Sequence, residues 1–371
     1  MKFTVLKSAI VEALGIIGSV VVQRSVRPIL NNVHIVVGDD GRATLVSTDL
    51  MEISLRYRLP LVEVAATGEA LLPIARTLSI AREAPSEQIT FEQDEPGKIT
   101  IRSGRSVFNV LSDNPADYPQ VPEFRTAGSF TLDRTKLLRL IRKTQFAIAK
   151  EKSRFAFNGA VLHLTNGEAR MVATDGKRLA IMKETVDHGE SLATRPIIPL
   201  RALHAFDKLL ALDEESAQIA VDEREIMLRT PRADVIAPLL EGSFPDYQAV
   251  IPKETPTLVR FNRLELASAF RQAALLTSQD SRSVRMSLAD GKATLRSQAP
   301  DAGAATIDID APDYVGEPIS IAFNPDYFDE GLRVMESETV TLGLAKANQP
   351  AVLMGDENFL YVVMPITLRN A

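Results

Sequence analysis

The chain has 371 residues, with 42 basic and 48 acidic side chains, a formal net charge of −6, and no cysteine or tryptophan. This length predicts two or three domains, and a hydrophobic fraction of 45% excludes a disordered or collagen-like chain. Without cysteine, disulfides, thiolate metal sites and thiol nucleophiles are excluded. The mild acidity argues against a uniformly basic protein that coats nucleic acid, but not against a locally basic one.

The apolar stretch at residues 9–22 fits either a secretory signal or an amphipathic helix. Its apolar residues recur at helical spacing and Glu12 interrupts it, so the helix is favoured. No other uncharged apolar run reaches the roughly 18 residues that a membrane-spanning helix needs. We therefore expect a soluble, cytoplasmic protein.

Local patterns of the first third of the chain return in the second third at one spacing. Asn158 follows Asn32 by 126 residues (158 − 32 = 126). The same spacing relates Thr48-Asp49 to Thr174-Asp175, Pro73 to Pro199, and Tyr118-Pro119 to Phe244-Pro245. A more diverged third copy has Asn324 in the place of Pro199. Since the spacing is about a third of the chain, the sequence predicts three copies of one unit.

Each copy begins with a predicted helix, continues with strands joined by a tight turn, and adds a second helix and a last hairpin. The predicted first helices are 6–22, 133–149 and 263–278, and the second helices are 74–83, 200–211 and 325–336. Asn166-Gly167 and Asp290-Gly291 are hairpin signals. This order predicts an α+β unit in which two helices cover one face of an antiparallel sheet. The predicted domains are 1–125, 126–254 and 255–371.

Basic side chains concentrate in the predicted helices. Residues 130–154 contain eight basic and two acidic residues, a local charge of +6, and Lys136, Arg139 and Lys143 are expected on the polar side of their helix. Such segregation attracts a polyanion to one face through phosphate contacts, although a solvated face is the alternative. No aromatic-rich basic stretch accompanies it, which favours duplex over single-stranded nucleic acid.

The sequence has no recognisable catalytic or phosphate-binding motif. The four histidines have no partner at metal-ligand spacing, and Gly176-Lys177 lacks the first glycine of a phosphate loop because Met171 stands there. We therefore predict no catalytic residue, no metal site and no cofactor. Two other functions stay open at this point: a monomeric tandem-repeat adaptor that binds peptides but no DNA, and a hydrolase centred on Thr174-Asp175.

Six segments along the chain form a specific combination. They are Met1-Lys2-Phe3-Thr4-Val5, Arg27-Pro28-Ile29-Leu30-Asn31-Asn32, Ser47-Thr48-Asp49-Leu50, Ala173-Thr174-Asp175-Gly176-Lys177-Arg178-Leu179-Ala180, Phe244-Pro245-Asp246-Tyr247 and Tyr361-Val362-Val363-Met364-Pro365. Together they resemble the bacterial DNA polymerase III β sliding clamp family over the whole chain. The resemblance implies three tandem clamp domains, with antiparallel sheets outside and two helices per domain inside, in a ring-forming head-to-tail homodimer.

By resemblance, the ring encircles double-stranded DNA as a processivity factor without catalytic activity. The implied partners are the DNA polymerase III alpha subunit, the delta subunit of the clamp loader, other polymerases and repair proteins. The residues expected to face DNA are Arg24, Arg76, Lys150, Lys152, Arg154 and Arg201. The loop 150–156 departs from the glutamine- and tyrosine-containing form of the family, so its DNA contacts are expected to differ.

The resemblance also implies a site where short partner peptides bind, at the junction of the second and third domains. The matching positions are Phe157, Thr174, Gly176, Lys177, Arg178, Leu179, Pro245, Val250, Val362, Met364, Pro365 and Ile366. Their chemistry fits an apolar slot with a basic rim for leucine or phenylalanine anchors, with ordinary core as the alternative for Leu179 and Val362. Thr367 stands where many relatives have arginine, so peptide preference is expected to differ.

The dimer interface implied by the resemblance pairs the first domain of one subunit with the third domain of the other. Phe108 is expected to face Leu275 and Leu276 there. An apolar contact beside paired strand edges is physically reasonable, because it covers edges that would otherwise aggregate.

Overall fold

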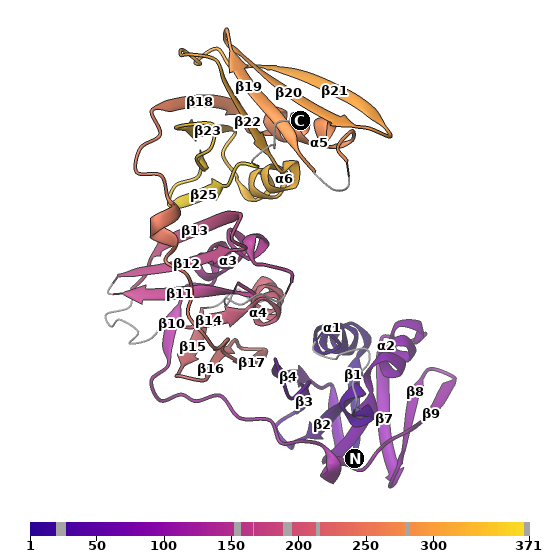
Figure 1. Ribbon diagram of the computed structural model, residues 1–371. Helices are drawn as coiled ribbons and strands as arrows, with labels where there is room; N and C mark the ends of the chain where they lie inside the picture. The colour runs from indigo at the N-terminus through magenta and orange to yellow at the C-terminus, as the bar shows by residue number, and fades with distance from the viewer. Residues whose placement is uncertain are drawn as a thin grey trace. The chain divides into compact units, whose positions relative to one another are not determined.

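The computed structural model describes residues 1–19, 27–151, 157–165, 167–187, 195–212, 216–278 and 282–366 (Figure 1). Its α-helices are α1 Lys7–Ile17, α2 Ile74–Glu83, α3 Arg134–Arg142, α4 Leu200–Leu212, α5 Arg263–Ala274 and α6 Pro325–Val334. Short 3-10 helices follow at η1 Pro28–Asn31, η2 Pro115–Asp117, η3 Gln145–Ala147 and η4 Tyr247–Val250. None of the helices in the described ranges is long and apolar enough to cross a membrane.

The first helix of each repeat is shorter than the sequence predicts. After α1, the hydroxyl of Ser19 donates to the carbonyl of Ile16 at 2.5 Å. After α3, the hydroxyl of Thr144 donates to the carbonyl of Leu140 at 2.7 Å, and the chain continues as η3. Serine and threonine hydroxyls compete in this way with the helical backbone, so local chemistry ends helices that apolar periodicity alone would extend.

Two sheets lie wholly within the first or the third repeat. Sheet A, in the order β5-β1-β7-β8-β9, contains β1 Lys2–Leu6, β5 Glu63–Ala66, β7 Gln88–Glu95, β8 Lys98–Ser103 and β9 Ser106–Leu111. Sheet D, in the order β21-β20-β19-β22, contains β19 Val284–Ala289, β20 Lys292–Ala299, β21 Gly303–Asp310 and β22 Ile319–Phe323. The turn Asp290-Gly291 joins β19 to β20 with φ of 51° and 70°, which confirms the predicted hairpin there.

The other two sheets combine strands of neighbouring repeats. Sheet B, in the order β10-β15-β16-β17-β4-β3-β2-β6, contains β2 Asn32–Val37, β3 Arg42–Thr48, β4 Ser54–Pro60, β6 Gly68–Pro73, β10 Phe130–Leu132, β15 Ala217–Val221, β16 Glu225–Arg229 and β17 Ala233–Pro238. Sheet C, in the order β14-β11-β12-β13-β25-β24-β23-β18, contains β11 Gly159–Thr165, β12 Glu168–Thr174, β13 Arg178–Thr185, β14 Ile197–Pro199, β18 Thr257–Asn262, β23 Thr339–Leu344, β24 Ala351–Met354 and β25 Phe359–Val363. Sheets B and C therefore cross the repeat boundaries, which the order of elements within one repeat did not predict.

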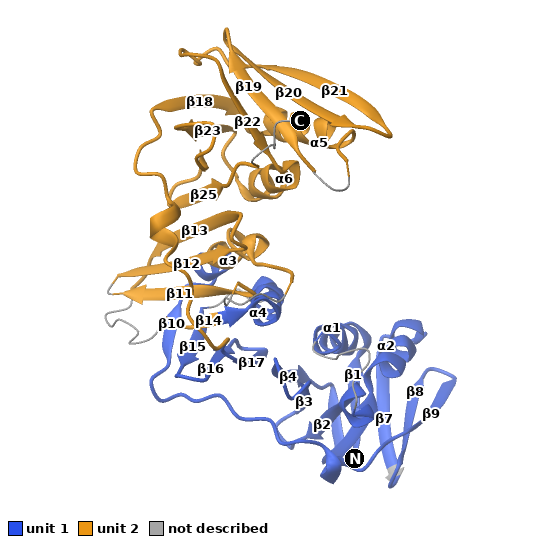
Figure 2. Ribbon diagram, viewed as in Figure 1, with its two compact units in different colours: residues 1–138, 198–239 blue, residues 139–197, 240–371 orange. Residues whose placement is uncertain are grey.

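Figure 2 shows the two compact units into which the chain divides. Unit 1 contains Met1–Leu138 and Ile198–Leu239, and unit 2 contains Arg139–Ile197 and Leu240–Ala371. The second repeat is shared between them, because its strands pair with the first repeat in sheet B and with the third in sheet C. The domain boundaries predicted from the sequence stay predictions.

Each unit has a core of apolar and aromatic side chains. In unit 1, Phe3 of β1 stacks on Phe91 of β7 with ring centres 5.0 Å apart. In unit 2, Phe270 of α5 stacks on Phe328 of α6 at 4.0 Å. Gly331 of α6 lets the helix approach sheet C closely, since a Cβ there would overlap the ring of the buried Tyr361.

Candidate functional site

The turn between β12 and β13 is held by its own side chains. The hydroxyl of Thr174 donates to the carbonyl of Arg178 at 2.5 Å and accepts from the amide of Gly176 at 3.0 Å. The Oδ1 atom of Asp175 accepts from the amides of Lys177 and Arg178 at 2.9 and 3.0 Å. Gly176 has a φ of 84°, in the left-handed region that favours glycine. The sequence Thr-Asp-Gly-Lys therefore forms one rigid turn.

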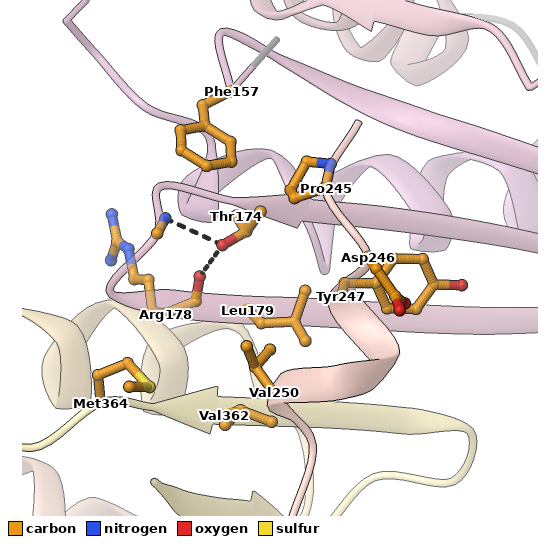
Figure 3. Close-up of a pocket in the computed structure, with 11 residues that line it drawn as sticks. Phe157, Thr174, Arg178, Leu179, Pro245, Asp246, Tyr247, Val250, Val362 and Met364 are labelled. Atoms are coloured by element: carbon orange, nitrogen blue, oxygen red, sulfur yellow. Dashed lines mark hydrogen bonds between the residues drawn. The ribbon is translucent and has the colours of Figure 1, made fainter. Parts of the chain in front are cut away.

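A pocket of about 160 Å³ lies beside this turn, within unit 2 (Figure 3). The turn and β13 supply Thr174, Gly176, Arg178 and Leu179; the segment around η4 supplies Pro245, Asp246, Tyr247 and Val250; Val362 and Met364 come from β25 and the residues after it, and Phe157 precedes β11. Nine of the residues that the resemblance implied for a peptide site thus meet at one cavity.

The floor of the pocket is part of the core of sheet C. Leu179 pairs with Val362 in the β13–β25 ladder, and the amide of Met364 extends the ladder to the carbonyl of Lys177 at 2.8 Å. Leu179 is 2% exposed and Val362 1%, whereas Val250, at the mouth, is 44% exposed. Figure 3 shows these three side chains converging. Leu179 and Val362 are therefore core residues that also form an apolar floor.

Arg178 does not form the exposed basic rim that the sequence predicted. Its guanidinium points away from Val250 in Figure 3, is 4% exposed, and forms ion pairs with Asp175 at 3.0 Å and with Glu330 of α6. Burial alone would lower the pKa of Arg178, but Tyr361, Glu330 and Asp175 raise it above its ordinary value. Arg178 thus ties the wall of the pocket to α6, and Lys177 is the exposed cation of the turn.

Tyr247 fixes the segment that forms the opposite wall. It is 7% exposed and its ring lies edge-on to Phe244 and His163, with centres 6.4 and 5.9 Å away. Burial, followed by the charges of Arg195 and Arg170, lowers the pKa of His163 to about 4, so this imidazole is neutral at pH 7.

Sequence reasoning missed Asp246 and Tyr247 as lining residues. The side chain of Asp246 caps η4 by accepting from the amide of Gln248 at 3.2 Å. The signal was available in the segment Phe244-Pro245-Asp246-Tyr247, in which an acidic cap precedes a helical turn. Of the other residues selected for this site, Lys177 is exposed on the turn, and Pro365 and Ile366 are partly buried after β25. Thr367 lies outside the described residues.

The residues expected to face DNA have different surroundings. Arg24, Lys152 and Arg154 lie outside the described residues. Arg76 is exposed on α2, and the side chain of Lys150 is 78% exposed, 3.8 Å from Glu330. Arg201 of α4 forms ion pairs with Asp49 at 2.7 Å and Glu52 at 3.0 Å, so its guanidinium also serves to hold the turn after β3.

Lys143 was expected on the polar side of the first helix of the second repeat, but it is buried. It is 3% exposed, and its ammonium contacts Asp356 at 2.5 Å. Lys143 directly follows α3, and its amide still donates to the carbonyl of Arg139 at 3.0 Å, so its burial comes from the distant partner Asp356. Arg139, by contrast, lies on α3 and pairs with Glu184 at 3.0 Å.

Of the residues expected at a dimer interface, Phe108 lies on an edge strand, and Leu275 and Leu276 follow a helix. Phe108 is on β9, the outermost strand of sheet A, where Val107 and Leu111 are 50% and 76% exposed. Leu275 and Leu276 follow α5 in unit 2, and Leu275 is 80% exposed. Within the described part of the chain, no cluster of three or more histidine, aspartate or glutamate side chains could hold a metal ion.

Comparison with known proteins covers the whole chain. Models of the DNA polymerase III beta subunit match the N-terminal domain at residues 1–122, the central domain at 131–246 and the C-terminal domain at 248–367. The beta sliding clamp of Pseudomonas putida is 33% identical, with 99% of this chain and 100% of the relative covered. The beta sliding clamp of Chlamydia muridarum is 30% identical, with 100% of both covered.

Solved structures agree with this match. The DNA polymerase III subunit beta from Pseudomonas aeruginosa has a TM-score of 0.90 at 30% identity, covering 99% of this chain and 100% of that one. The DNA polymerase sliding clamp from Bacillus subtilis has a TM-score of 0.92 at 26% identity, with 100% of both covered. The chain, with its three tandem clamp domains, therefore belongs to the DNA polymerase III beta subunit family, the beta sliding clamps.

Proposed function

We propose that this protein encircles duplex DNA as a head-to-tail homodimer and tethers the replicative polymerase through the pocket beside Leu179 and Val250. The observation that carries the proposal is this apolar pocket, whose floor is formed where strands of the second and third repeats pair. A leucine or phenylalanine of a partner peptide would remove the exposed Val250 from water. Burying one such anchor contributes about 1.5–3 kcal/mol.

Encirclement is supported by the open edges and by the exposed cations. β9 in sheet A and β21 in sheet D are edge strands, and apolar side chains beside such edges invite aggregation unless a partner covers them. A head-to-tail dimer would cover Phe108 with Leu275 and Leu276. Arg76 and Lys150 would then contact phosphates weakly, which permits sliding because a closed ring is retained by topology. Arg24, Lys152, Arg154 and Arg201 complete the proposed DNA-facing set.

The same pocket would serve the polymerase III alpha subunit, the delta subunit of the clamp loader, other polymerases and repair proteins. We propose a non-catalytic role in the cytoplasm for this chain. Its part in DNA synthesis would be to raise the local concentration of bound enzymes at the DNA.

Retention on DNA of different topology tests the proposal. After loading onto nicked circular DNA by a clamp loader, the protein should stay bound during gel filtration at high salt and leave when the circle is cut. Equal loss from circular and linear DNA would contradict encirclement and favour a peptide-binding adaptor.

Leu276→Asp tests the dimer. The buried charge should prevent the apolar contact, so sedimentation should show monomers. Val315→Asp is the matched control, because Val315 is 92% exposed in the same unit and its variant should stay dimeric. A dimeric Leu276→Asp variant would contradict the proposed interface.

A further inference from the structure

The face of sheet C that carries the segment 240–253 also carries a row of basic side chains. Arg170 of β12 stands opposite Lys183 of β13, and His163 of β11 stands opposite Arg170 on its other side. Side chains alternate along a strand, so this row points away from the face on which Tyr361 packs against α6. The row therefore lies on the side of the sheet that α6 leaves uncovered.

Two adjoining cavities follow this row, both lined by Arg170, Tyr247 and Gln248. One, of about 430 Å³, reaches Arg195, His163 and Glu168. The other, of about 660 Å³, reaches Lys183 and Lys253, and its apolar lining includes Ile181, Ile251, Met354 and Leu360. The two cavities together are named the basic groove.

The basic groove is continuous with the peptide pocket. Pro245, Asp246 and Tyr247 line both the pocket and the smaller cavity. Tyr247 also lines the larger cavity, so the pocket and the groove lie on two sides of the same short segment. A peptide anchored in the pocket needs only to cross this segment to reach the groove.

The groove has a small excess of positive charge, because its lining contains four cations and three carboxylates: Arg170, Lys183, Arg195 and Lys253 against Glu168, Asp246 and Asp356. Like charges directly opposite each other on neighbouring strands, such as Arg170 and Lys183, are destabilising. Arg170 pairs with Glu168 at 2.6 Å, but no carboxylate among the described residues pairs with Lys183 or Lys253. The carboxylate of Asp356 also lines the groove, but it already binds Lys143.

We propose that the basic groove binds acidic residues that flank the anchor segment of a partner peptide. The inference rests on the proposed function, since the same peptide would occupy the pocket. The groove combines Lys183 and Lys253 with the apolar side chains of Met354 and Leu360, a lining that suits an acidic and apolar peptide. A nucleic-acid backbone would use the cations and leave the apolar side chains without a contact.

The test uses the full chain and three synthetic peptides with the same leucine and phenylalanine anchors. One has neutral flanks, and the others have two aspartates on the amino or the carboxyl side. One acidic peptide should bind about three- to tenfold more tightly than the neutral one at low salt. Lys183→Ala/Lys253→Ala should remove this difference and leave the affinity for the neutral peptide unchanged.

Lys292→Ala/Lys346→Ala is the matched control, because both lysines are exposed in unit 2 and the same charge is removed. This variant should keep the preference for the acidic peptide. Equal affinities of all three peptides for the unmodified protein would overturn the proposed role of the groove without contradicting the proposed role of the pocket. No binding of any peptide would instead overturn the proposed function. A third outcome combines two results: fluorescent single-stranded DNA binds only when Lys183 and Lys253 are present, and the protein does not prefer the acidic peptides. This outcome would assign the groove to nucleic acid and overturn the proposal.

Discussion

The turn after β3 and the turn after β12 are two versions of one structure. In the first, the hydroxyl of Thr48 accepts from the amide of Leu50 at 2.9 Å, and Asp49 accepts from three following amides. In the second, Thr174 and Asp175 play the same parts. Each turn is also tied by an ion pair to a helix of the next repeat, through Arg201 in the first and Glu330 in the second.

The side chains around the two turns differ. At the repeat position of Val250 stands Phe124 (250 − 126 = 124), which is 7% exposed and packs with Met227 and Ile236. Leu50, with a φ of 63°, stands where the second turn has Gly176. The backbone thus supplies the same junction twice, and side-chain volume decides which junction has room for a peptide.

The largest difference between the two junctions should lie in how much their ion pairs contribute to the free energy of unfolding. Arg178→Met should lower the free energy of unfolding by about 3–5 kcal/mol, because it leaves Asp175 and Glu330 without their buried cation. Arg201→Met should cost about 1 kcal/mol, since Arg201 is 29% exposed and Asp49 keeps its amide donors. Urea denaturation measures both. Equal losses would show that the two turns are held equally.

Phe124→Val gives the first junction the smaller side chain that the second junction has at Val250. It should cost about 2–3 kcal/mol, because Phe124 is buried and also lies under the guanidinium of Arg229, 4.3 Å from the ring centre. Thermal and urea unfolding provide the measurement. A loss below about 1 kcal/mol would mean that the surroundings collapse into the space and that volume at this position is not decisive.

Val250→Phe gives the second junction the larger side chain that the first junction has at Phe124. It should fill the pocket from its exposed mouth, lower peptide affinity at least about tenfold, and change stability by less than about 1 kcal/mol. Isothermal titration with a leucine- and phenylalanine-bearing peptide measures the affinity. Val315→Phe, at an exposed position away from the pocket, is the matched control and should bind normally. Unchanged affinity of Val250→Phe would separate the pocket from peptide binding.

Local patterns in the sequence predicted the parts of the fold that depend on neighbouring residues. The second helices begin at Ile74 and Leu200, the first residues of the predicted ranges 74–83 and 200–211. The repeated Thr-Asp motifs are structurally equivalent turns, as the spacing of 126 residues suggested. Such features follow from turn chemistry and apolar periodicity, which one sequence displays directly.

Local sequence patterns did not predict which strands pair when they lie far apart in the chain. No local pattern shows that β4 pairs with β17 or that β13 pairs with β25, so the shared sheets were missed. Lys143 was assigned to a polar side for the same reason, since its partner Asp356 is 213 residues away. The pocket residues came from the family resemblance, and residue type alone would have left Leu179 and Val362 as ordinary core.

A smaller effect should appear as a pH dependence of stability that arises in sheet C. Burial lowers the pKa of His163 in sheet C from 6.5 to about 4, so between these values the unfolded chain binds a proton that the folded chain does not. Stability is therefore retained above pH 6.5 and lost as the pH falls toward 4. Because this imidazole is only half-buried, we expect a loss of about 1 kcal/mol.

His163→Gln should remove that part of the slope when urea midpoints are compared at pH 7 and pH 5. If His163→Gln keeps the slope of the unmodified protein, the loss of stability at low pH arises from carboxylates, and Tyr247 packs against His163 without depending on its neutral form.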